Sequence, residues 1–337
     1  MGKIDVTIAM PVYNASDFIE KSLRTAFEQT HKNIEILILN DCSTDGSIEV
    51  IHRIAEKYHI LLTIYNSPKN KGVGAMRNKA IELAKGDYLY FLDSDDYMSE
   101  DCLELMISEA RKYDADLVIG SHMDVRDDVK YIKKEEPFSF DKPDEFATYA
   151  FTKRYGYAGG VWNKLMKTDL LRQDHILFPD FRVGEDVPFI FQLITKVQKV
   201  VLIDKVTYQY IIRPGSLCQY NPRDIIPKRE VDTHVASKLL LKDILSQNID
   251  KPYYIPMLTI VMDYCLDTVR VIIEKRKIIE KQVSLSTLKQ MMHYPAKISQ
   301  IMKYGGRRNY INYLLCHMPL SFVFSFFIFR KFCKDMT

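Results

Sequence analysis

Three carboxylates stand within four residues in Asp93-Ser94-Asp95-Asp96, directly after the apolar run from Tyr88 to Leu92. Carboxylates this close repel one another unless a cation lies among them. Their oxygen atoms favour hard divalent ions, and Mg²⁺ or Mn²⁺ usually keeps waters and completes its shell with phosphates of a substrate. The cluster therefore predicts a metal site that can bind a diphosphate.

Two other interpretations of this cluster stay open. Asp95 or Asp96 could cap the helix that is expected from Asp101. An Asp-x-Asp motif also occurs in phosphohydrolases of the haloacid dehalogenase type. There it follows the first strand, with Thr or Val two residues on, whereas here it follows the fourth, which disfavours that class.

A further acidic position follows another apolar run. Asp41 comes directly after the run from Ile34 to Asn40, and helix capping explains this position poorly. We expect Asp41 to accept the N3–H of a uracil base. Asp45 and Ser47, by contrast, are expected to cap the helix that begins beside them.

The first and third apolar runs also end in residues suited to ligand binding. Pro11 in Pro11-Val12-Tyr13-Asn14 is expected to stop the strand ladder and turn the chain out over the sheet edge. In Asn70 to Asn78, two glycines permit close approach of backbone to a ligand, and the following helix N-terminus favours anions. Arg77 is expected to contact phosphate or base, with a solvated surface side chain as the alternative. The full dinucleotide fingerprint is absent, because it would follow the first strand and contain a third glycine.

The elements that position these residues are short apolar runs alternating with helical spacing. Strands are predicted at Val6 to Met10, Ile34 to Asn40, Leu61 to Tyr65, Tyr88 to Leu92 and Leu117 to Ser121, and helices at Phe18 to Gln29, Ser47 to Tyr58, Val73 to Ala84 and Asp101 to Tyr113. Strands that are apolar on both faces and separated by helices indicate an α/β fold with a mostly parallel central sheet. Ligands of such sheets bind beyond the C-terminal ends of the strands, so these polar residues are expected to share one edge.

The pattern changes after about residue 122. We expect a charged excursion from Asp127 to Pro137, a short helix from Pro143 to Thr152, a loop rich in glycine and tyrosine from Tyr155 to Gly160, strands at Val200 to Ile203 and Thr207 to Ile212, and helices at Val231 to Leu245, Tyr253 to Glu274 and Ser284 to Met292. This order predicts a helical region after the sheet.

The bulk composition is that of a folded globular protein. The chain has 337 residues, 47% of them hydrophobic, which is enough for one large core or two moderate ones. A net charge of +3 is too small to suggest nucleic acid as a partner. Six scattered cysteines, with no Cys-x-x-Cys pair, indicate neither a zinc site nor a disulfide framework. The N-terminus lacks the long apolar run of a signal peptide, so a cytoplasmic location is expected.

The C-terminal segment from Leu320 to Phe329 is apolar and rich in phenylalanine. It is too short to span a bilayer, which takes about 20 apolar residues. Its basic flanks, Arg307-Arg308 and Arg330-Lys331, are typical of a helix that lies in a membrane interface. We therefore expect peripheral contact with the inner face of the cell membrane. The alternative is a helix packed on the catalytic domain or on a second subunit.

Taken together, these motifs resemble the inverting family 2 glycosyltransferases with the GT-A fold. The matching pieces are Pro11 to Asn14, Asn40-Asp41 with Ser43 to Ser47, Gly72 to Asn78, and Gly86-Asp87 through Asp96, in this order and spacing. The resemblance is strong over about residues 4 to 122 and looser to about residue 215. It implies transfer of a sugar from a nucleotide-diphosphate sugar, commonly a UDP-sugar, to a glycan or lipid-linked saccharide. The settings it implies are bacterial capsule, O-antigen and exopolysaccharide synthesis.

The resemblance also implies roles for residues at the strand ends. The donor would be bound by Pro11, Tyr13, Asn14, Asp41, Arg77, Asp93, Ser94 and Arg213. Asp41 would contact the nucleobase, Asp93 the ribose or sugar, and Asp95 would bind the Mn²⁺ or Mg²⁺ that bridges the diphosphate. Arg213 begins a segment, Arg213 to Ser216, that in family members often closes over the donor. A turn with a solvated arginine is the alternative.

The acceptor side is expected further along the chain. Two carboxylates, Glu185-Asp186, stand at the start of a predicted helix, where dipole-stabilised caps are the ordinary interpretation. In the family that the chain resembles, this pair is the acceptor-side motif, and Asp186 is the general base. Inversion is a single displacement, so a carboxylate must take the proton of the acceptor hydroxyl. Glu185 is expected to orient the acceptor or to raise the pKa of Asp186. Trp162, the only tryptophan, is expected to stack on the acceptor sugar, with core packing as the alternative.

These expectations divide the chain into four parts. Residues 1–122 would form the nucleotide-sugar-binding part and residues 123–226 the acceptor-binding part of a GT-A domain. A helical C-terminal region would follow at 227–312, and an amphipathic, aromatic tail at 313–337. Two other functions stay open. A sugar-nucleotide nucleotidyltransferase would carry a glycine-rich signature at Pro11 to Asn14. A non-catalytic nucleotide- or glycan-binding module would need no base at Glu185-Asp186.

Overall fold

The computed structural model describes residues 3–127, 129–153, 160–181, 184–213, 230–277, 279, 283–304 and 307–335. The chain divides into two compact units, one formed by Met1–Phe146 with Gly159–Gln219 and the other by Ala147–Ala158 with Tyr220–Thr337. The predicted loop from Tyr155 to Gly160 lies outside the described residues except for Gly160, as does the segment after Arg213.

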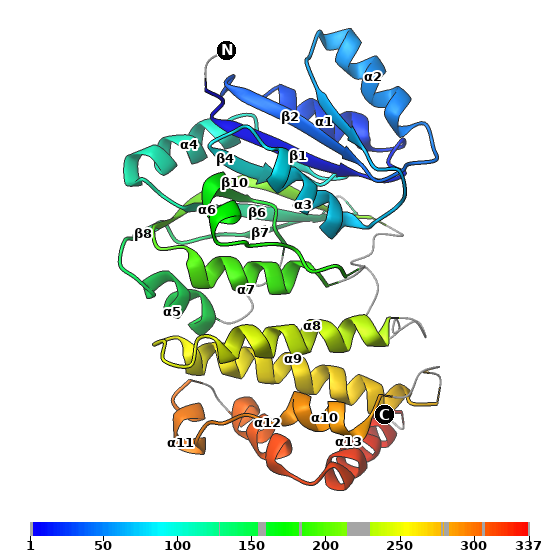
Figure 1. Ribbon diagram of the computed structural model, residues 1–337, viewed down its shortest axis with the longest axis vertical. Coiled ribbons are helices and arrows are strands. Elements are labelled where there is room, and N and C mark those ends of the chain that lie inside the picture. Colours follow the sequence, from blue (N-terminus) through cyan, green and yellow to red (C-terminus); the bar gives the residue numbers. More distant parts are fainter. Residues whose placement is uncertain are drawn as a thin grey trace. The chain divides into compact units, whose positions relative to one another are not determined.

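The first unit is a single mixed sheet with helices on both faces (Figure 1). Its order is β3-β2-β1-β4-β9-β6-β10-β5, with β7 on β6 and β8 on β10. The strands are β1 (Val6–Val12), β2 (Ile34–Asn40), β3 (Thr63–Asn66), β4 (Tyr88–Phe91), β5 (Tyr97–Met98), β6 (Leu117–Arg126), β7 (Val129–Lys133), β8 (Phe138–Phe140), β9 (Lys164–Lys167) and β10 (Val200–Ile212). The predicted α/β class is confirmed. β1 to β4 are parallel, whereas β5, β7, β8 and β9 pair antiparallel with their neighbours.

The strands are apolar on both faces because helices cover both. On one side, Ile8 and Met10 of β1 share a core with α1 (Ile19–Phe27), α2 (Ser47–Tyr58) and α4 (Cys102–Tyr113). The other side carries α3 (Val73–Leu83), α6 (Thr168–Gln173) and α7 (Asp186–Lys196). A short helix, α5, spans Glu145–Thr152. The four helices predicted before residue 114 are confirmed to within two residues at each end.

Strand direction brings distant parts of the chain to one edge of the sheet. The parallel strands β1, β2 and β4 end there, and β9 begins there because it runs antiparallel to β4. β10 ends at the same edge because it is parallel to β6, which is antiparallel to β9. The polar residues that follow these strands therefore meet at this edge, as the sequence predicts.

Pro11 does not stop the strand ladder as expected. It pairs with Leu39, and Val12 pairs with Asn40, so β1 continues beside β2 for two residues beyond Met10. The β4 ladder reaches only Ala9, which pairs with Phe91. The N–H that proline lacks would point to the β4 side, where that ladder has already ended, so proline costs no hydrogen bond here.

Two further expectations in this unit were wrong. The charged excursion from Asp127 to Pro137 contains β7, an exposed strand paired with β6. The lysines of β7 obscure the alternation of polar and apolar residues by which a strand is recognised. The two strands predicted at Val200 to Ile203 and Thr207 to Ile212 form the single strand β10. Its register against β6 shifts between Ile203 and Tyr208, because a bulge takes up the extra residues.

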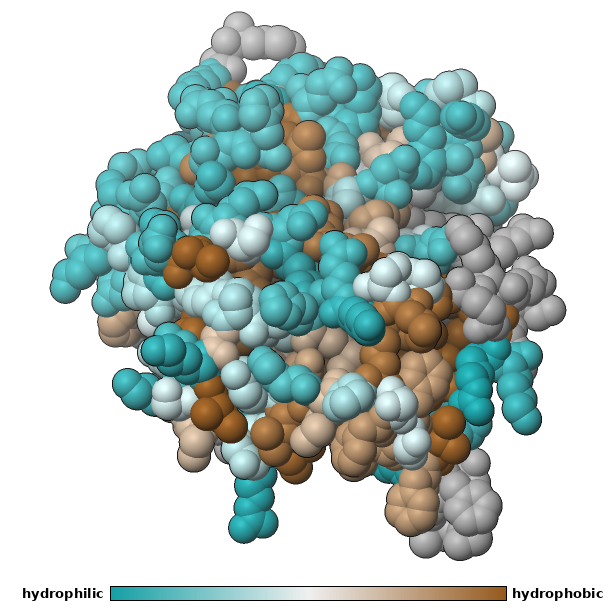
Figure 2. Space-filling model, turned by 60° about the horizontal axis from the view of Figure 1, so that its bottom comes forward, coloured by the Kyte–Doolittle hydropathy of each residue, from teal (hydrophilic) through white to brown (hydrophobic). Residues whose placement is uncertain are grey.

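The second unit is a group of helices packed around one apolar helix. Its elements are α8 (Val231–Ser246), α9 (Tyr254–Lys275), α10 (Leu285–Met292), α11 (Ile298–Ile301), α12 (Arg307–His317) and α13 (Leu320–Asp335). α9 contacts each of the other five, which explains why most of its side chains are buried. Apolar side chains also reach the surface of this unit (Figure 2). Over the described residues, no helix is both long and apolar enough to cross a membrane.

A buried carboxylate joins α12 to α9 in this unit. Asp263 of α9 is 3% exposed, and its Oδ1 and Oδ2 accept hydrogen bonds from Nε and Nη2 of Arg308 at 3.1 and 3.0 Å. Asn312 donates to the same carboxylate. Because a buried charge needs such partners, the pair fixes the position of α12 along α9.

Asp45 fastens the loop after β2 to the loop after β1. Its Oδ2 accepts from the amide of Ser16 and its Oδ1 from the amide of Ser47, both at 3.0 Å. The expected contact with the first turn of α2 is therefore confirmed. The Ser47 hydroxyl donates to Asp45 Oδ1 and accepts from the amide of Ala15 at 2.7 Å. Burial raises the pKa of Asp45, but these hydrogen bonds outweigh it and lower the pKa to about 2.

Asp45→Ala should lower the free energy of unfolding by about 1–2 kcal/mol at pH 7, because it removes the cap and the bond to Ser16. The native pKa lies below the unfolded value, so the stabilisation is present above about pH 4 and lost as the pH falls towards 2. Urea denaturation of wild type and variant between pH 7 and pH 3 would show the difference shrinking. Asp17→Ala, at an exposed position, is the control. A difference that does not change with pH would contradict this account.

Candidate active site

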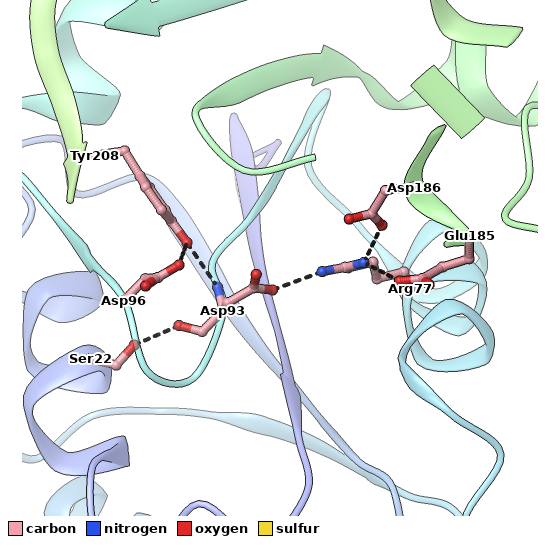
Figure 3. A network of polar contacts seen from close by, with 7 residues as sticks. All are labelled: Ser22, Arg77, Asp93, Asp96, Glu185, Asp186 and Tyr208. Carbon is pink, nitrogen blue, oxygen red and sulfur yellow. Dashed lines mark hydrogen bonds and ion pairs between the residues drawn. The ribbon is translucent and has the colours of Figure 1, made fainter. Parts of the chain in front are cut away.

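The guanidinium of Arg77 lies among three carboxylates from two distant parts of the chain (Figure 3). Its Nη2 donates to Asp93 Oδ1 at 2.9 Å, and its Nη1 donates to Glu185 Oε1 at 3.1 Å and to Asp186 Oδ1 at 2.6 Å. The Arg77 side chain is 4% exposed. This network joins the acidic cluster after β4 to the Glu185-Asp186 pair at the start of α7.

The start of α3, which carries Arg77, is held by the end of β2. Asp41 Oδ1 accepts from the amide of Lys71 and Oδ2 from the amide of Gly72, each at 2.7 Å. Gly72 has φ +88°, a conformation that glycine adopts without strain. Gly74 then allows α3 to approach the segment before α7, since a Cβ there would lie 3.2 Å from Glu185 Cγ.

Phe178 fixes the other side of this contact. The Asn78 side chain donates to the Phe178 carbonyl and accepts from its amide, both at 2.8 Å. The Phe178 ring stacks on Phe189 of α7 with centroids 3.9 Å apart and meets Phe91 of β4 edge-on at 5.7 Å. The Arg77 guanidinium lies 5.5 Å from the Phe178 ring centre. These aromatic rings exclude water, so the charge of Arg77 depends on its carboxylates.

Burial and mutual repulsion leave this cluster with more carboxylates than one arginine can neutralise. Burial lowers the pKa of Arg77, but the three carboxylates outweigh it and raise the pKa. Burial also raises the pKa of Asp93, despite the opposing effect of Arg77. The pKa of Glu185 rises to about 8 through burial and the nearby Asp186. Glu185 is the more buried of the two, with a side chain 8% exposed against 29% for Asp186, so burial acts more strongly on Glu185.

Asp96, which had no assigned role, fastens the acidic turn to β10. Its Oδ2 accepts from the Tyr208 hydroxyl and its Oδ1 from the amide of Ile211, both at 2.7 Å. The Asp93 amide donates to the Tyr208 hydroxyl at 3.4 Å, and the Ser22 hydroxyl donates to the Asp93 carbonyl at 3.0 Å (Figure 3). Burial, with repulsion from Asp93 and Asp95, raises the pKa of Asp96 to about 8. Nothing in the sequence pattern singled out Ser22 or Tyr208.

Asp95, the predicted metal ligand, faces an arginine. Both Nε and Nη2 of Arg213 lie 2.9 Å from Asp95 Oδ2. Arg77, Arg213 and Tyr208 therefore offset part of the repulsion among the three carboxylates, and metal binding at this cluster stays a prediction. In the described ranges, no three metal-binding side chains cluster around one point.

The residues present nevertheless fit a metal held mainly by a substrate. Asp95 is 22% exposed, and its contact with Arg213 uses Oδ2. Mg²⁺ is commonly held by one or two carboxylates together with phosphate oxygens and waters. Asp95 can serve as such a carboxylate.

The other residues predicted to bind the donor lie at the ends of β1 and β4. Tyr13 is 51% exposed, Ser94 is partly exposed and Pro11 is buried within β1. Asn14, at φ +48°, donates its amide to Ser43 Oγ at 3.1 Å and accepts at Oδ1 from the Thr44 amide at 2.9 Å. Asn14 thus joins the two loops.

Trp162 packs against aromatic rings of β10. It stacks on Tyr208 and Tyr210 with centroids 4.9 and 5.3 Å apart and meets His122 edge-on at 4.7 Å. Gly160, at φ +60°, makes room for the indole, since a Cβ there would lie 2.5 Å from it. These contacts account for the position of Trp162 as packing, and its contact with an acceptor sugar stays a prediction.

The structure thus changes the predicted roles of two residues. Arg77 is neither a solvated side chain nor open to a donor, because its terminal nitrogens bind three carboxylates. Glu185 is 6% exposed and faces Arg77, which leaves it little surface for an acceptor. Asp186, 29% exposed, is the more accessible carboxylate of this pair.

Comparison with known proteins shows which family of proteins the chain matches. Residues 7–179 match the family described as Glycosyl transferase family 2. Glycosyltransferase GlyA of Streptococcus pneumoniae is 30% identical over 227 residues, covering 63% of this chain and 31% of the relative. Poly(ribitol-phosphate) beta-glucosyltransferase of Bacillus spizizenii is 29% identical over 213 residues, covering 62% and 32%. The matched region therefore spans about a third of the length of these two relatives.

Two solved structures share the fold. TarS 1-349 of S. aureus, in complex with UDP-GlcNAc, has a TM-score of 0.62 at 16% identity, covering 93% of this chain and 90% of that one. The mannosyltransferase PcManGT from Pyrobaculum calidifontis, in complex with GDP-Man and Mn²⁺, has a TM-score of 0.53 at 15% identity, covering 93% and 86%. At these sequence identities, the comparison shows only that the folds are similar.

Replacing Arg77 by Gln would leave Asp93, Glu185 and Asp186 without their shared cation. We expect the free energy of unfolding at pH 7 to fall by about 3–5 kcal/mol, as when one partner of a buried ion pair is removed. Lys79→Gln on the same helix breaks an exposed pair with Glu82 and should cost less than about 1 kcal/mol. Urea denaturation of both variants measures the difference. An equal loss of unfolding free energy in the two variants would contradict this account, because the buried network would then stabilise the fold no more than an exposed ion pair does.

Proposed function

The chain belongs to glycosyltransferase family 2, with the GT-A fold, and we propose that it transfers a sugar from a nucleotide-diphosphate sugar to a saccharide acceptor with inversion at the anomeric carbon. The observation that carries this proposal is the Arg77 network. It holds Asp93, expected on the donor side, and Asp186, expected on the acceptor side, against one guanidinium. A displacement of this kind requires the donor and the base within reach of one another.

Asp186 serves as the general base. An acceptor hydroxyl can reach its carboxylate, which is 29% exposed and held in place by Arg77 through Oδ1. Asp186 takes the hydroxyl proton as the oxygen attacks the anomeric carbon. The bond from that carbon to the diphosphate oxygen breaks as the new bond forms, and the nucleoside diphosphate leaves with the electron pair. Glu185 lies beside this step, bound to the same guanidinium as Asp186.

The donor occupies the edge formed by the ends of β1, β2 and β4. Asp41 accepts the N3–H of uracil in addition to its two amide bonds, because a carboxylate oxygen has more than one lone pair. Pro11, Tyr13 and Asn14 line the base pocket, and Asp93 with Ser94 faces the ribose or sugar. The UDP-GlcNAc bound to the S. aureus neighbour supports a UDP-sugar as donor.

Asp95 would hold the divalent cation, Mn²⁺ or Mg²⁺, together with the phosphates of the donor. When bound, this cation supplies positive charge that offsets the charge on the departing diphosphate. Arg213, which pairs with Asp95, adds a second positive group beside the same diphosphate. The Mn²⁺ and GDP-Man in the P. calidifontis neighbour support a metal-dependent donor site.

The acceptor is a glycan or a lipid-linked saccharide in the synthesis of a surface polysaccharide. The B. spizizenii relative, named for a poly(ribitol-phosphate) acceptor, supports a polymeric substrate of this kind. The reaction takes place in the cytoplasm, with peripheral contact to the inner face of the cell membrane.

Membership of the family argues against a nucleotidyltransferase. If the chain were a non-catalytic nucleotide- or glycan-binding module, it would show no turnover that depends on Asp186.

Asp186→Asn should reduce turnover by about 10²- to 10⁴-fold, because the amide cannot accept the proton of the acceptor hydroxyl. Donor binding should be retained. The measurement is the release of nucleoside diphosphate, with the donor and acceptor that support wild-type turnover, alongside calorimetric titration of UDP. Asp169→Asn, an exposed carboxylate of α6, is the matched control. Transfer by Asp186→Asn at the wild-type rate would remove Asp186 as the base.

Asp95→Asn should weaken the binding of UDP in the presence of Mn²⁺ by about tenfold or more, because one metal ligand is lost. Binding of UDP without metal should change much less. Calorimetric titration of UDP with and without Mn²⁺ tests this without any turnover. Glu100→Gln, an exposed carboxylate five residues further on, is the control. An unchanged effect of Mn²⁺ in Asp95→Asn would place the metal elsewhere.

A further inference from the structure

The C-terminal part of the chain is strongly basic. Between residues 281 and 334 there are nine basic side chains and no acidic one: Lys281, Lys289, Lys297, Lys303, Arg307, Arg308, Arg330, Lys331 and Lys334. The rest of the chain contains the other 38 basic and all 44 acidic side chains. The overall charge of +3 is therefore the sum of a positive segment, residues 281–334, and a negative charge on the rest of the chain.

The same segment exposes large apolar side chains. α12 and α13 both pack against α9, with Asn309 and Leu315 of α12 and Val323 and Phe327 of α13 buried. Other residues of this segment are 41% to 69% exposed: Tyr310, Ile311, Met318, Phe322 and Phe329. We call these five residues the C-terminal apolar surface. Figure 2 shows brown apolar side chains among teal hydrophilic ones on the face that comes forward.

The spacing of the exposed residues follows the helices. Phe322 and Phe329 are seven residues apart, so they lie on the same side of α13, with Ser325 between them. Tyr310 and Ile311 lie on one side of α12, and Met318 follows directly after its last residue. A solvated helix would carry polar residues at these positions, so both helices present an apolar stripe away from α9.

Basic side chains flank these stripes. Arg307 begins α12 and Lys303 precedes it by four residues, whereas Arg330 and Lys331 lie near the end of α13. All four are exposed, and Lys331 also donates to the Glu274 carbonyl at 3.3 Å. Arg308 has a different task, because its guanidinium is held by Asp263. The surface thus combines exposed aromatic rings with cations at both ends.

We propose that the C-terminal apolar surface docks on an anionic lipid bilayer, with α12 and α13 lying in the headgroup region. Aromatic and aliphatic side chains enter the interface, while the lysines and arginines meet the lipid phosphates. α13 is too short and too interrupted by polar residues to cross the bilayer, which is consistent with a helix that lies along it. The proposal concerns the helical unit alone and holds whatever donor or acceptor the enzyme uses.

Charge favours an anionic bilayer over a second copy of the chain as the partner of the C-terminal apolar surface. A twofold contact would place the same basic side chains of both copies against each other, with no acidic residue between 281 and 334 to compensate. An anionic bilayer provides the opposite charge over the whole surface.

The test is co-sedimentation of the full chain with vesicles of phosphatidylcholine alone or with about 30% phosphatidylglycerol. We expect binding to the anionic vesicles only, weakened about tenfold or more when the salt rises from about 0.1 to about 0.5 M. The double variant Phe322→Ser with Phe329→Ser should bind about tenfold more weakly or worse. Arg330→Gln with Lys331→Gln should lower binding about 30-fold, since each basic residue contributes about fivefold.

Two variants of the other unit serve as matched controls. Lys32→Gln with Lys57→Gln removes two exposed lysines, and Leu61→Ser removes an apolar side chain that is 92% exposed. Both should bind vesicles as the wild type does. Circular dichroism of every variant, and its turnover with a soluble acceptor, should match wild type, which separates this test from that of Asp186.

Three results would overturn the proposal. The first is equal binding to neutral and anionic vesicles, and the second is no binding to either by the folded wild type. The third is a dimer in solution, measured by light scattering, that the Phe322→Ser and Phe329→Ser variant abolishes, because a second copy would then be the occupant of this surface.

Discussion

A single buried cation sets the geometry of the site. The guanidinium of Arg77 lies in an environment walled by Phe91 and Phe178, where an unpaired charge would be very unfavourable. It is stable there because three carboxylates surround it. Two of these come from the start of α7 and one from the turn after β4. The need to pair this one charge therefore holds the two sides of the site at a fixed separation.

The rest of the first unit can be understood as support for that contact. Asp41 holds the amides at the start of α3, Gly74 lets the helix come close, and Asn78 pairs with the backbone of Phe178. On the other side, Tyr208 and Asp96 fasten the acidic turn to β10. The polar contacts among these join residues at least 30 positions apart in sequence, so they preorganise the site.

The sequence predicted the sheet edge well, because it depends on local patterns. Apolar runs and helical spacing located β1, β2 and β4, and parallel strands bring their ends together without any knowledge of packing. The partners of Arg77 could not be predicted in this way. They lie 16 and more than 100 residues away, and their contact depends on how α3 and α7 pack around Phe178. The same limit applies to the acidic cluster. The sequence suggested a cation among its carboxylates, but it could not show that Arg77 and Arg213, from elsewhere in the fold, pair with Asp93 and Asp95.

The central claim is that Asp93 and Asp186 act as one electrostatic unit through Arg77, and a double-mutant cycle tests it most directly. The free energy of unfolding would be measured for Asp93→Asn, Asp186→Asn and the double variant. Because both carboxylates share one cation and repel each other, the account predicts that their effects are non-additive by about 1 kcal/mol or more. Effects that add to within about 0.5 kcal/mol would contradict it, because residues that do not interact behave in that way.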